Sequence, residues 1–429
     1  MSYAATRYIS RHRRIAIVLG ALLPMTLAAC SSGGSSSSTT TASSTKPTGS
    51  SGTVTLKVGG FGNGSFFSGS EIGAEARFQR FNNTNEMPGV KIEFTGFSDD
   101  QGSPSVALSN ARQLITQDHV FAIVPDMSTD NPTAYMTAQK TPWIGWGIDS
   151  SYCSTTGKPT TSIWGFGVWG CSVAPNPPVV PDTYGQLYQY VTKTLGVKSP
   201  SIELFSNDTA SGIASVKQEE HATNGAGFRT FTTDSAVPTG VTDWTPYVQS
   251  WLKADNGKAP TAIGCLGTTA CVPAYAAVKA AGYTGTFDYA LGPIAALAPA
   301  MAGAVTAAFY NASPNPGLTQ MTKDIDTFKP GTAISSTSNV PTYFAADMFI
   351  QALEKVGKAN LTQANVQKAL STITYGIKGK NWVLVGPTDY SKATVVTYPF
   401  CQEMFKATAT GYTSLAPYAC STKQYSTGS

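Results

Sequence analysis

A strand, a glycine-rich turn and a helix are predicted over residues 54–83, an arrangement with which many enzymes hold a phosphate. The dinucleotide fingerprint needs Gly-x-Gly-x-x-Gly, but in neither register do the glycines supply the third one, because Ser65 or Phe67 stands there. No Gly-Lys-Ser or Gly-Lys-Thr follows, so the phosphate-loop pattern is absent too. What remains is a flexible turn with Phe66 and Phe67, either a structural loop or part of a site for an organic ligand. The helix that follows has free N–H groups that can attract a carboxylate.

Residues for catalysis are sparse in this sequence. A serine hydrolase needs Gly-x-Ser-x-Gly and a histidine base, and no such pentapeptide occurs. His119 precedes an apolar run and His221 lies in a helical pattern, where solvated surface histidines are expected. The adjacent carboxylates at 99–100 and 219–220 point apart, which makes them poor acid–base pairs. We therefore expect no enzyme and no cofactor.

Seven cysteines divide into Cys30 near the start and six more that fall into three neighbouring couples. Zinc is disfavoured for the six, because no Cys-x-x-Cys occurs and only two histidines lie beyond the leader. Oxidation is favoured in an exported chain. The disulfides we expect are Cys153–Cys171, Cys265–Cys271 and Cys401–Cys420.

The first 29 residues read as an export signal. Four arginines precede an apolar run over 15–27, which is too short to span a bilayer comfortably, and Leu-Ala-Ala-Cys ends it at Cys30. This ending resembles a bacterial lipoprotein signal, in which the cysteine is lipid-modified and becomes the first mature residue; an ordinary secretory signal is the alternative. We expect the mature protein to be extracytoplasmic and anchored to the lipid bilayer through Cys30.

A Ser/Gly/Thr-rich tract follows, so residues 30–53 are expected to form a disordered tether with a reach on the order of 25 Å. The charge balance also changes at the leader. The chain has 29 basic and 25 acidic residues, and removal of the four leader arginines leaves 25 of each. With no Lys/Arg cluster in the remainder, nucleic-acid binding is not expected.

From Val54 onward, short β-rich apolar runs alternate with helical runs, which indicates βαβ units and parallel sheets covered on both faces. Roughly 375 residues exceed what one core usually holds, so two domains are expected. The alternation breaks near 164–181, a stretch of Gly, Trp, Pro and Cys. In open α/β sheets the ligand lies at the carboxyl ends of the strands, so residues just after each strand are the candidates.

Over Val54 to about Leu415 the chain resembles the type I solute-binding proteins of the branched-chain amino-acid class, receptors of ABC importers. The segments that carry this resemblance are "GAEARFQRFN", "PGVKIEFTGFSDD", "ARQLITQDHVFAIVP", "TPWIGWG" and "YAAVKAAGYTG". It implies two Rossmann-like lobes joined by three crossover strands that close on a ligand. The implied segments are 54–163 and 306–390 for lobe 1, 168–304 and 394–420 for lobe 2, and 421–429 as a tail.

The resemblance also implies ligand contacts. An aromatic cover falls on Phe66, and the hydroxyl-bearing turn that grips a ligand carboxylate falls on Ser128 and Thr129. Further contacts in lobe 1 and lobe 2 map to Trp146, Gly147, Asp149, Thr209, Leu266 and Gly267.

One position departs from the family pattern. Members that bind amino acids place an acid in lobe 2 against the ligand ammonium, and Leu291 stands at that position here. Either Asp149 or Asp288 substitutes, or the ligand has no ammonium, because a buried ammonium without a counter-charge is costly. We favour the second option, with Phe66, Trp143 and Trp146 forming an apolar surface unless the tryptophans simply pack the core.

The expected partners are a small solute and the permease subunits of an ABC importer, with the receptor itself a monomer. A lipoprotein that senses a ligand and signals to a membrane partner is the alternative, and the sequence does not separate the two roles.

Overall fold

The computed structural model describes residues 52–64, 67–153, 163–174, 176–267, 270–391 and 397–428. The leader, Cys30 and nearly all of the expected tether lie outside the described residues, as does Phe66. In the part of the chain that is described, no helix has both the length and the apolar character needed to cross a membrane.

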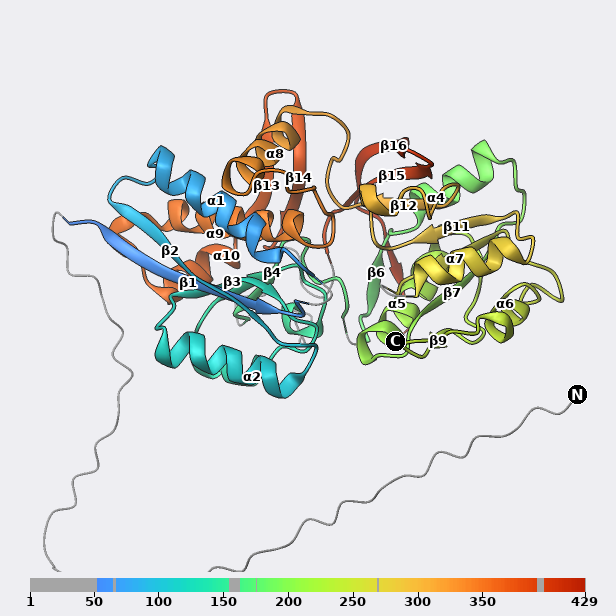
Figure 1. The fold of residues 1–429 in the computed structure, drawn as a ribbon, viewed down its shortest axis with the longest axis horizontal. Helices are drawn as coiled ribbons and strands as arrows, with labels where there is room; N and C mark the ends of the chain where they lie inside the picture. The colour runs from blue at the N-terminus through green and yellow to red at the C-terminus, as the bar shows by residue number, and fades with distance from the viewer. Residues whose placement is uncertain are drawn as a thin grey trace, which may run out of the picture. The chain divides into compact units, whose positions relative to one another are not determined.

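The first sheet is parallel and has the order β2-β1-β3-β4-β5 (Figure 1). Its strands are β1 Val54–Gly62, β2 Val90–Asp99, β3 Ala122–Met127, β4 Trp143–Gly145 and β5 Gly165–Gly167. All six residues of the central strand β3 are buried, as expected for a parallel strand covered on both faces. Alternate residues serve opposite faces, so that Val124 joins one apolar cluster and Ile123 another.

Helices and a hairpin from two distant parts of the chain cover this sheet. The elements between its strands are α1 Ser70–Thr84, α2 Pro104–Arg112, η1 Gln113–Gln117, α3 Thr133–Ala138 and η2 Ser150–Tyr152. The later ones are α8 Pro316–Phe328, α9 Asn339–Val356, η5 Lys358–Asn360, α10 Gln363–Leu370 and the hairpin β13 Thr374–Gly379 and β14 Trp382–Asp389.

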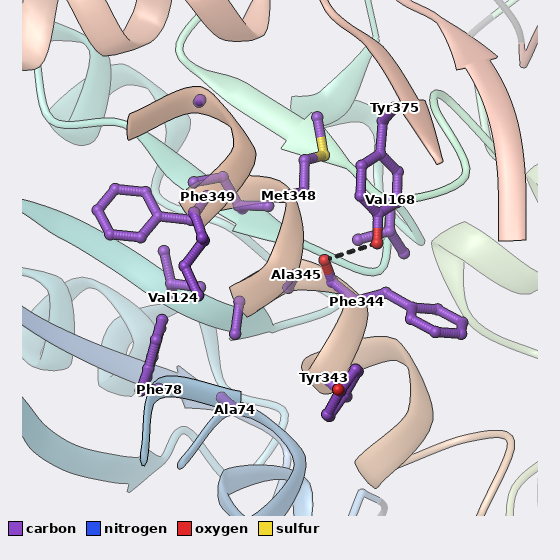
Figure 2. Packing of buried hydrophobic residues seen from close by; sticks show 14 of the residues in the cluster. Ala74, Phe78, Val124, Val168, Tyr343, Phe344, Ala345, Met348, Phe349 and Tyr375 are labelled. Carbon is purple, nitrogen blue, oxygen red and sulfur yellow. Dashed lines mark hydrogen bonds between the residues drawn. The ribbon is translucent and has the colours of Figure 1, made fainter. Parts of the chain in front are cut away.

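Helix α9 is the centre of the first lobe's core. Phe344, Met348 and Phe349 share one buried cluster with Val124 of β3, and the hydroxyl of Tyr375 donates to the carbonyl of Phe344 at 3.1 Å (Figure 2). Helix α1 approaches so closely that a Cβ on Gly73 would lie 1.9 Å from the carbonyl oxygen of Asn339. Only glycine fits there, and the buried face of α9 explains why a helix more than 200 residues from β3 belongs to this lobe.

The second sheet has the path β16-β15-β12-β11-β10-β7-β8, with β9 also paired to β7. It is parallel from β8 to β12 and antiparallel at β15 and β16, so it is mixed where the sequence predicts parallel strands. Its strands are β7 Ser201–Asn207, β8 Arg229–Phe231, β9 Ala236–Val237, β10 Ala262–Cys265, β11 Thr286–Tyr289, β12 Val305–Ala308, β15 Phe400–Thr408 and β16 Gly411–Ser421.

Two apolar clusters cover the faces of this second sheet. Its helices are α4 Gly185–Gln189, η3 Tyr190–Thr194, α5 Ala210–Ala226, α6 Thr245–Trp251, α7 Cys271–Ala280 and η4 Ala295–Leu297. Trp251 of α6 stacks on Phe205 of β7, with ring centroids 4.2 Å apart.

Three segments run between the sheets, and hydrogen bonds join them. The first follows β5, the second follows β12 and the third precedes β15. The indole N–H of Trp169 in the first donates to the carbonyl of Phe309 in the second at 2.8 Å. The backbone N–H of Thr397 in the third donates to the carbonyl of Cys171 in the first at 3.1 Å. The α/β fold with two lobes and three crossovers predicted from the sequence is thus present.

The structure differs from the expected boundaries at two places. Strand β5 extends the first sheet beyond residue 163. The expected tail contains β17 Gln424–Ser426, which pairs antiparallel with β6 Val179–Pro181. The hydroxyl of Tyr425 donates to Asp182 at 2.8 Å, so the end of the chain is part of the second lobe.

Three disulfides join cysteines of the described residues, and they are the pairs expected from the spacing: Cys153–Cys171, Cys265–Cys271 and Cys401–Cys420.

Candidate functional site

Strand register gathers the candidate loops of the first sheet at one edge. Gly62 at the end of β1 pairs with Asp99 of β2 and with Met127 of β3, and Asp126 of β3 pairs with Gly145 of β4. Because parallel strands end at the same edge, the loops after β1, β2, β3 and β4 are neighbours.

The loop after β3 carries Ser128 and Thr129. Ser128 is buried, its backbone N–H donates to Asp126 Oδ1 at 3.0 Å, and its hydroxyl oxygen accepts from the N–H of Asp130 at 3.2 Å. Thr129 is half-buried, and its hydroxyl donates to the exposed Asp130 carboxylate at 3.2 Å. The following helix α3 has only six residues, so the grip on a carboxylate by helix N–H groups that the resemblance implies has little support here.

The loop after β4 contributes an indole and a glycine. Trp146 is half-buried and meets Phe67 edge-on with ring centroids 5.5 Å apart, and Trp169 at 5.8 Å. Gly147 has φ +99°, and a Cβ there would lie 2.4 Å from the carbonyl oxygen of Gly170. Glycine is therefore required where this loop passes the first crossover.

Asp149 stabilises the same loop through hydrogen bonds. One of its carboxylate oxygens accepts from the N–H of Ser151 at 2.7 Å and the other from the N–H of Asn131 at 2.9 Å. Burial raises its pKa, and the two N–H donors oppose that shift. Both oxygens are engaged, one within its own loop and one with the loop after β3, which favours a structural role over pairing with a ligand ammonium.

The tryptophans differ in their burial. Trp143 is 1% exposed and packs with Phe61 and Met136, so it belongs to the core and not to an apolar mouth. Phe66 lies outside the described residues, whereas its neighbour Phe67 is buried against Trp146. The sequence analysis placed Phe67 in the glycine-rich turn but did not single it out as a site residue. The two adjacent aromatic residues after β1 were the signal that could have identified it.

The second sheet brings Thr209, Leu266 and Gly267 to its own carboxyl edge, after β7 and β10. Thr209 is exposed and caps α5, with its hydroxyl accepting from the N–H of Gly212 at 3.0 Å. The Cys265–Cys271 disulfide encloses the loop that holds Leu266 and Gly267.

Leu291 and Asp288 differ from these loop residues in their position. Leu291 is 8% exposed and belongs to the buried cluster that contains Tyr289 and Met301. Asp288 lies within β11, paired with Gly264 and Val305, rather than in the loop beyond the strand. These two positions test neither the expected ligand contacts nor the absence of an ammonium group on the ligand, so both stay predictions.

Buried carboxylates at the first edge are the feature that sequence reasoning missed. Asp100 follows β2 and is 1% exposed, and Asp126 near the end of β3 is fully buried. Burial raises the pKa of both carboxyl groups, well above the ordinary range for Asp126. Their position at strand ends was a usable signal, but their burial was not visible in the sequence.

An open hollow of about 490 Å³ lies elsewhere, beside the start of β7, and Tyr188, Lys198 and Arg229 are among its lining residues. It is at the amino end of the parallel strand, opposite the edge at which this fold holds ligands. We do not assign the site to it.

The chain belongs to the periplasmic binding protein family, whose model matches residues 52–396. This family consists of extracytoplasmic solute-binding proteins, which are not enzymes. Comparison with curated protein sequences gives no match.

Solved structures with this fold are distant in sequence. A branched-chain amino-acid ABC transporter protein from Thermus thermophilus, with bound valine, is 15% identical with a TM-score of 0.65; the match covers 86% of this chain and 97% of that one. A solute-binding protein from R. palustris in complex with benzoate is 12% identical, with a TM-score of 0.64 and coverage of 86% and 98%. A fatty acid ABC transporter substrate-binding protein from Thermomonospora curvata is 16% identical, with a TM-score of 0.64 and coverage of 87% and 93%. These likenesses show the fold.

Proposed function

We propose that this protein is the solute-binding receptor of an ABC importer, and that it captures a small organic solute between its two lobes by hinge closure. The solute class is branched-chain amino acid-like, an amide, or a small aromatic or apolar carboxylate. Among the structural neighbours, one holds valine, one is in complex with benzoate and one is a fatty acid transporter protein, which are the amino-acid and carboxylate parts of this range. The closed form would be presented to the permease, with the receptor held at the membrane through a lipid on Cys30.

The observation that carries this proposal is the composition of the two carboxyl edges. The first edge offers the half-buried ring of Trp146 beside Phe67, with the hydroxyl-bearing turn at Ser128 and Thr129. The second offers Thr209 and the disulfide-enclosed loop at Gly267. A few polar groups at strand ends would give specificity, and contact between the solute and the aromatic rings would slow its release.

The test begins with thermal-shift screening of the exported protein, carrying Cys30→Ser to keep it free of lipid. The library holds amino acids, amides, amines and small carboxylates, and hits are measured by calorimetry. If the protein is correctly folded and no solute of the library stabilises it, a receptor role for these compounds is rejected.

Trp146→Ala should weaken binding of the best hit by about 1–3 kcal/mol, because the ring loses its contact with the solute. Trp382→Ala is the matched control, since Trp382 is also half-buried but lies on β14 against Gly317 and Gly379. Equal affinities of the two variants would return Trp146 to a purely structural role.

A further inference from the structure

Five aromatic rings form a continuous row from the first carboxyl edge to the crossovers. The centroid distances are 5.5 Å from Phe67 to Trp146, 5.8 Å from Trp146 to Trp169, 5.6 Å from Trp169 to Phe309 and 5.4 Å from Phe309 to Phe400. The rings meet edge-on, with interplanar angles of 64° to 75°. Edge-to-face rings attract each other through their quadrupoles in addition to the effect of burial.

The last three rings of this row lie on the three crossovers. Trp169 follows β5, Phe309 follows β12, and Phe400 begins β15. Phe309 and Phe400 therefore adjoin strands of the second sheet, whereas Trp146 follows β4 of the first. A shift of one ring in a closely packed row displaces its neighbours, because packed side chains leave little free space.

Trp169 in the first crossover is bonded to both of the others. Its indole N–H donates to the carbonyl of Phe309 at 2.8 Å, and its own carbonyl accepts from the hydroxyl of Thr397. Its ring also meets that of Phe344 on α9, with centroids 6.1 Å apart. The side chain is thus held by the core of the first lobe and by the two segments that lead to the second lobe, and it packs against Trp146 as well.

A small cavity beside Trp169 leaves room for such a shift. It has a volume of about 10 Å³, and Trp169, Phe309, Thr397 and Phe400 are among its lining residues. This is roughly the space of a single water molecule. Protein interiors contain few voids, so a void where the crossovers meet indicates packing that can rearrange.

We infer that Trp169 is a positioning residue that couples contact between the solute and Trp146 to movement of the three crossovers, and that it thereby sets the balance between the open and the closed receptor. This role rests on the proposed function. Trp169 acts on affinity through Trp146 and the crossovers, without touching the solute.

The first test measures the distance between the lobes of the exported Cys30→Ser protein without any solute. Spin labels are attached to p-acetylphenylalanine introduced in place of Asn83 on α1 and Lys253 after α6, two exposed positions. Trp169→Leu should shift or broaden the distance distribution given by electron paramagnetic resonance, because the link between the crossovers is lost. Trp244→Leu is the matched control and should leave the distribution unchanged, since the half-buried Trp244 meets Tyr247 and Trp251 within the second lobe.

The second test measures binding by isothermal calorimetry, with L-valine, benzamide and benzoate as the probes. Trp169→Leu should weaken binding of the tightest probe about tenfold, because the apparent dissociation constant rises as the closed form becomes scarcer. Trp169→Phe keeps a ring in the row and should bind within about threefold of the parent protein. When it is combined with Trp146→Ala, Trp169→Leu should weaken binding less than it does alone, because the coupling is already cut.

Thermal melts verify that each variant folds. If Trp169→Leu does not fold, Thr397→Val takes its place in both tests, because it removes the hydroxyl that donates to the Trp169 carbonyl.

The outcomes separate this inference from the proposed function. An unchanged distance distribution in the folded variant would overturn the role of Trp169 and leave the receptor role intact. Full additivity of Trp146→Ala and Trp169→Leu would do the same. A changed distribution together with failure of the three probes and of the whole screening library would reject the receptor role, but would keep Trp169 as the residue that sets the balance of the lobes.

Discussion

Glu203 in β7 is fully buried in the second sheet, and neither carboxylate oxygen has a hydrogen-bond partner among the described residues. Burial raises its pKa from 4.5 to about 8, and the backbone N–H and the hydroxyl of Thr233, which lie nearby but outside hydrogen-bonding geometry, offset only part of that shift. Phe205 on the same strand and Trp251 stack nearby, so this carboxyl group lies at the margin of an apolar cluster.

The raised pKa makes the free energy of unfolding depend on pH. Between pH 4.5 and about 8 the unfolded chain releases the Glu203 proton while the folded chain keeps it, so stability falls as the pH rises. The stabilising effect is complete below pH 4.5, declines as the pH rises through this window, and is fully lost once the pH has passed about 8. At 1.36 kcal/mol per pKa unit, the loss from this one group reaches roughly 4 kcal/mol at pH 7.5.

Glu203→Gln removes the titration and keeps the shape. In urea unfolding followed by circular dichroism, the variant should match the parent protein within about 1 kcal/mol at pH 5 and exceed it by roughly 2–4 kcal/mol at pH 8. Glu220→Gln, on the half-exposed face of α5, is the control and should change neither value. A variant that tracks the parent protein at every pH would show that Glu203 is ionised in the folded state at little cost, which contradicts the reasoning.

Two further predictions concern the crossovers. Glu403 is also buried, but its carboxylate accepts from the N–H groups of Ala312 and Ser313 at 2.9 and 3.0 Å, so Glu403→Gln should lower stability by about 2–4 kcal/mol; a gain in urea unfolding would contradict this. Cys153→Ser combined with Cys171→Ser opens a bond that spans 18 residues and should cost about 3 kcal/mol in the same assay. Peptide mapping that showed either cysteine bonded elsewhere in the exported protein would remove the basis of this second prediction.

Much of the first lobe could be predicted from local sequence patterns. The apolar run of β3 and the helical pattern of α1 predict those elements because parallel strands and their covering helices bury residues with a fixed period. The candidate loops followed from the rule that ligands lie at the carboxyl ends of strands. Ser128 and Trp146 were assigned to these loops by the family resemblance, and their contact with a solute stays a prediction.

Long-range contacts were not predictable in the same way. β17 pairs with β6, and the contact of Tyr425 with Asp182 joins positions 243 residues apart, so the segment reads locally as a polar tail. Trp143 and Trp146 stand three residues apart, yet only the first packs fully into the core. The burial of Asp100 and Asp126 depends on neighbouring strands, which a charge count along the chain does not reveal.

A crystal structure of the exported protein with its tightest-binding solute tests the receptor assignment most directly. We predict one solute molecule in contact with Ser128 and Trp146 of the first sheet and with Thr209 or Gly267 of the second. A solute seated only in the hollow beside Lys198 and Arg229, with these four residues untouched, would contradict the account.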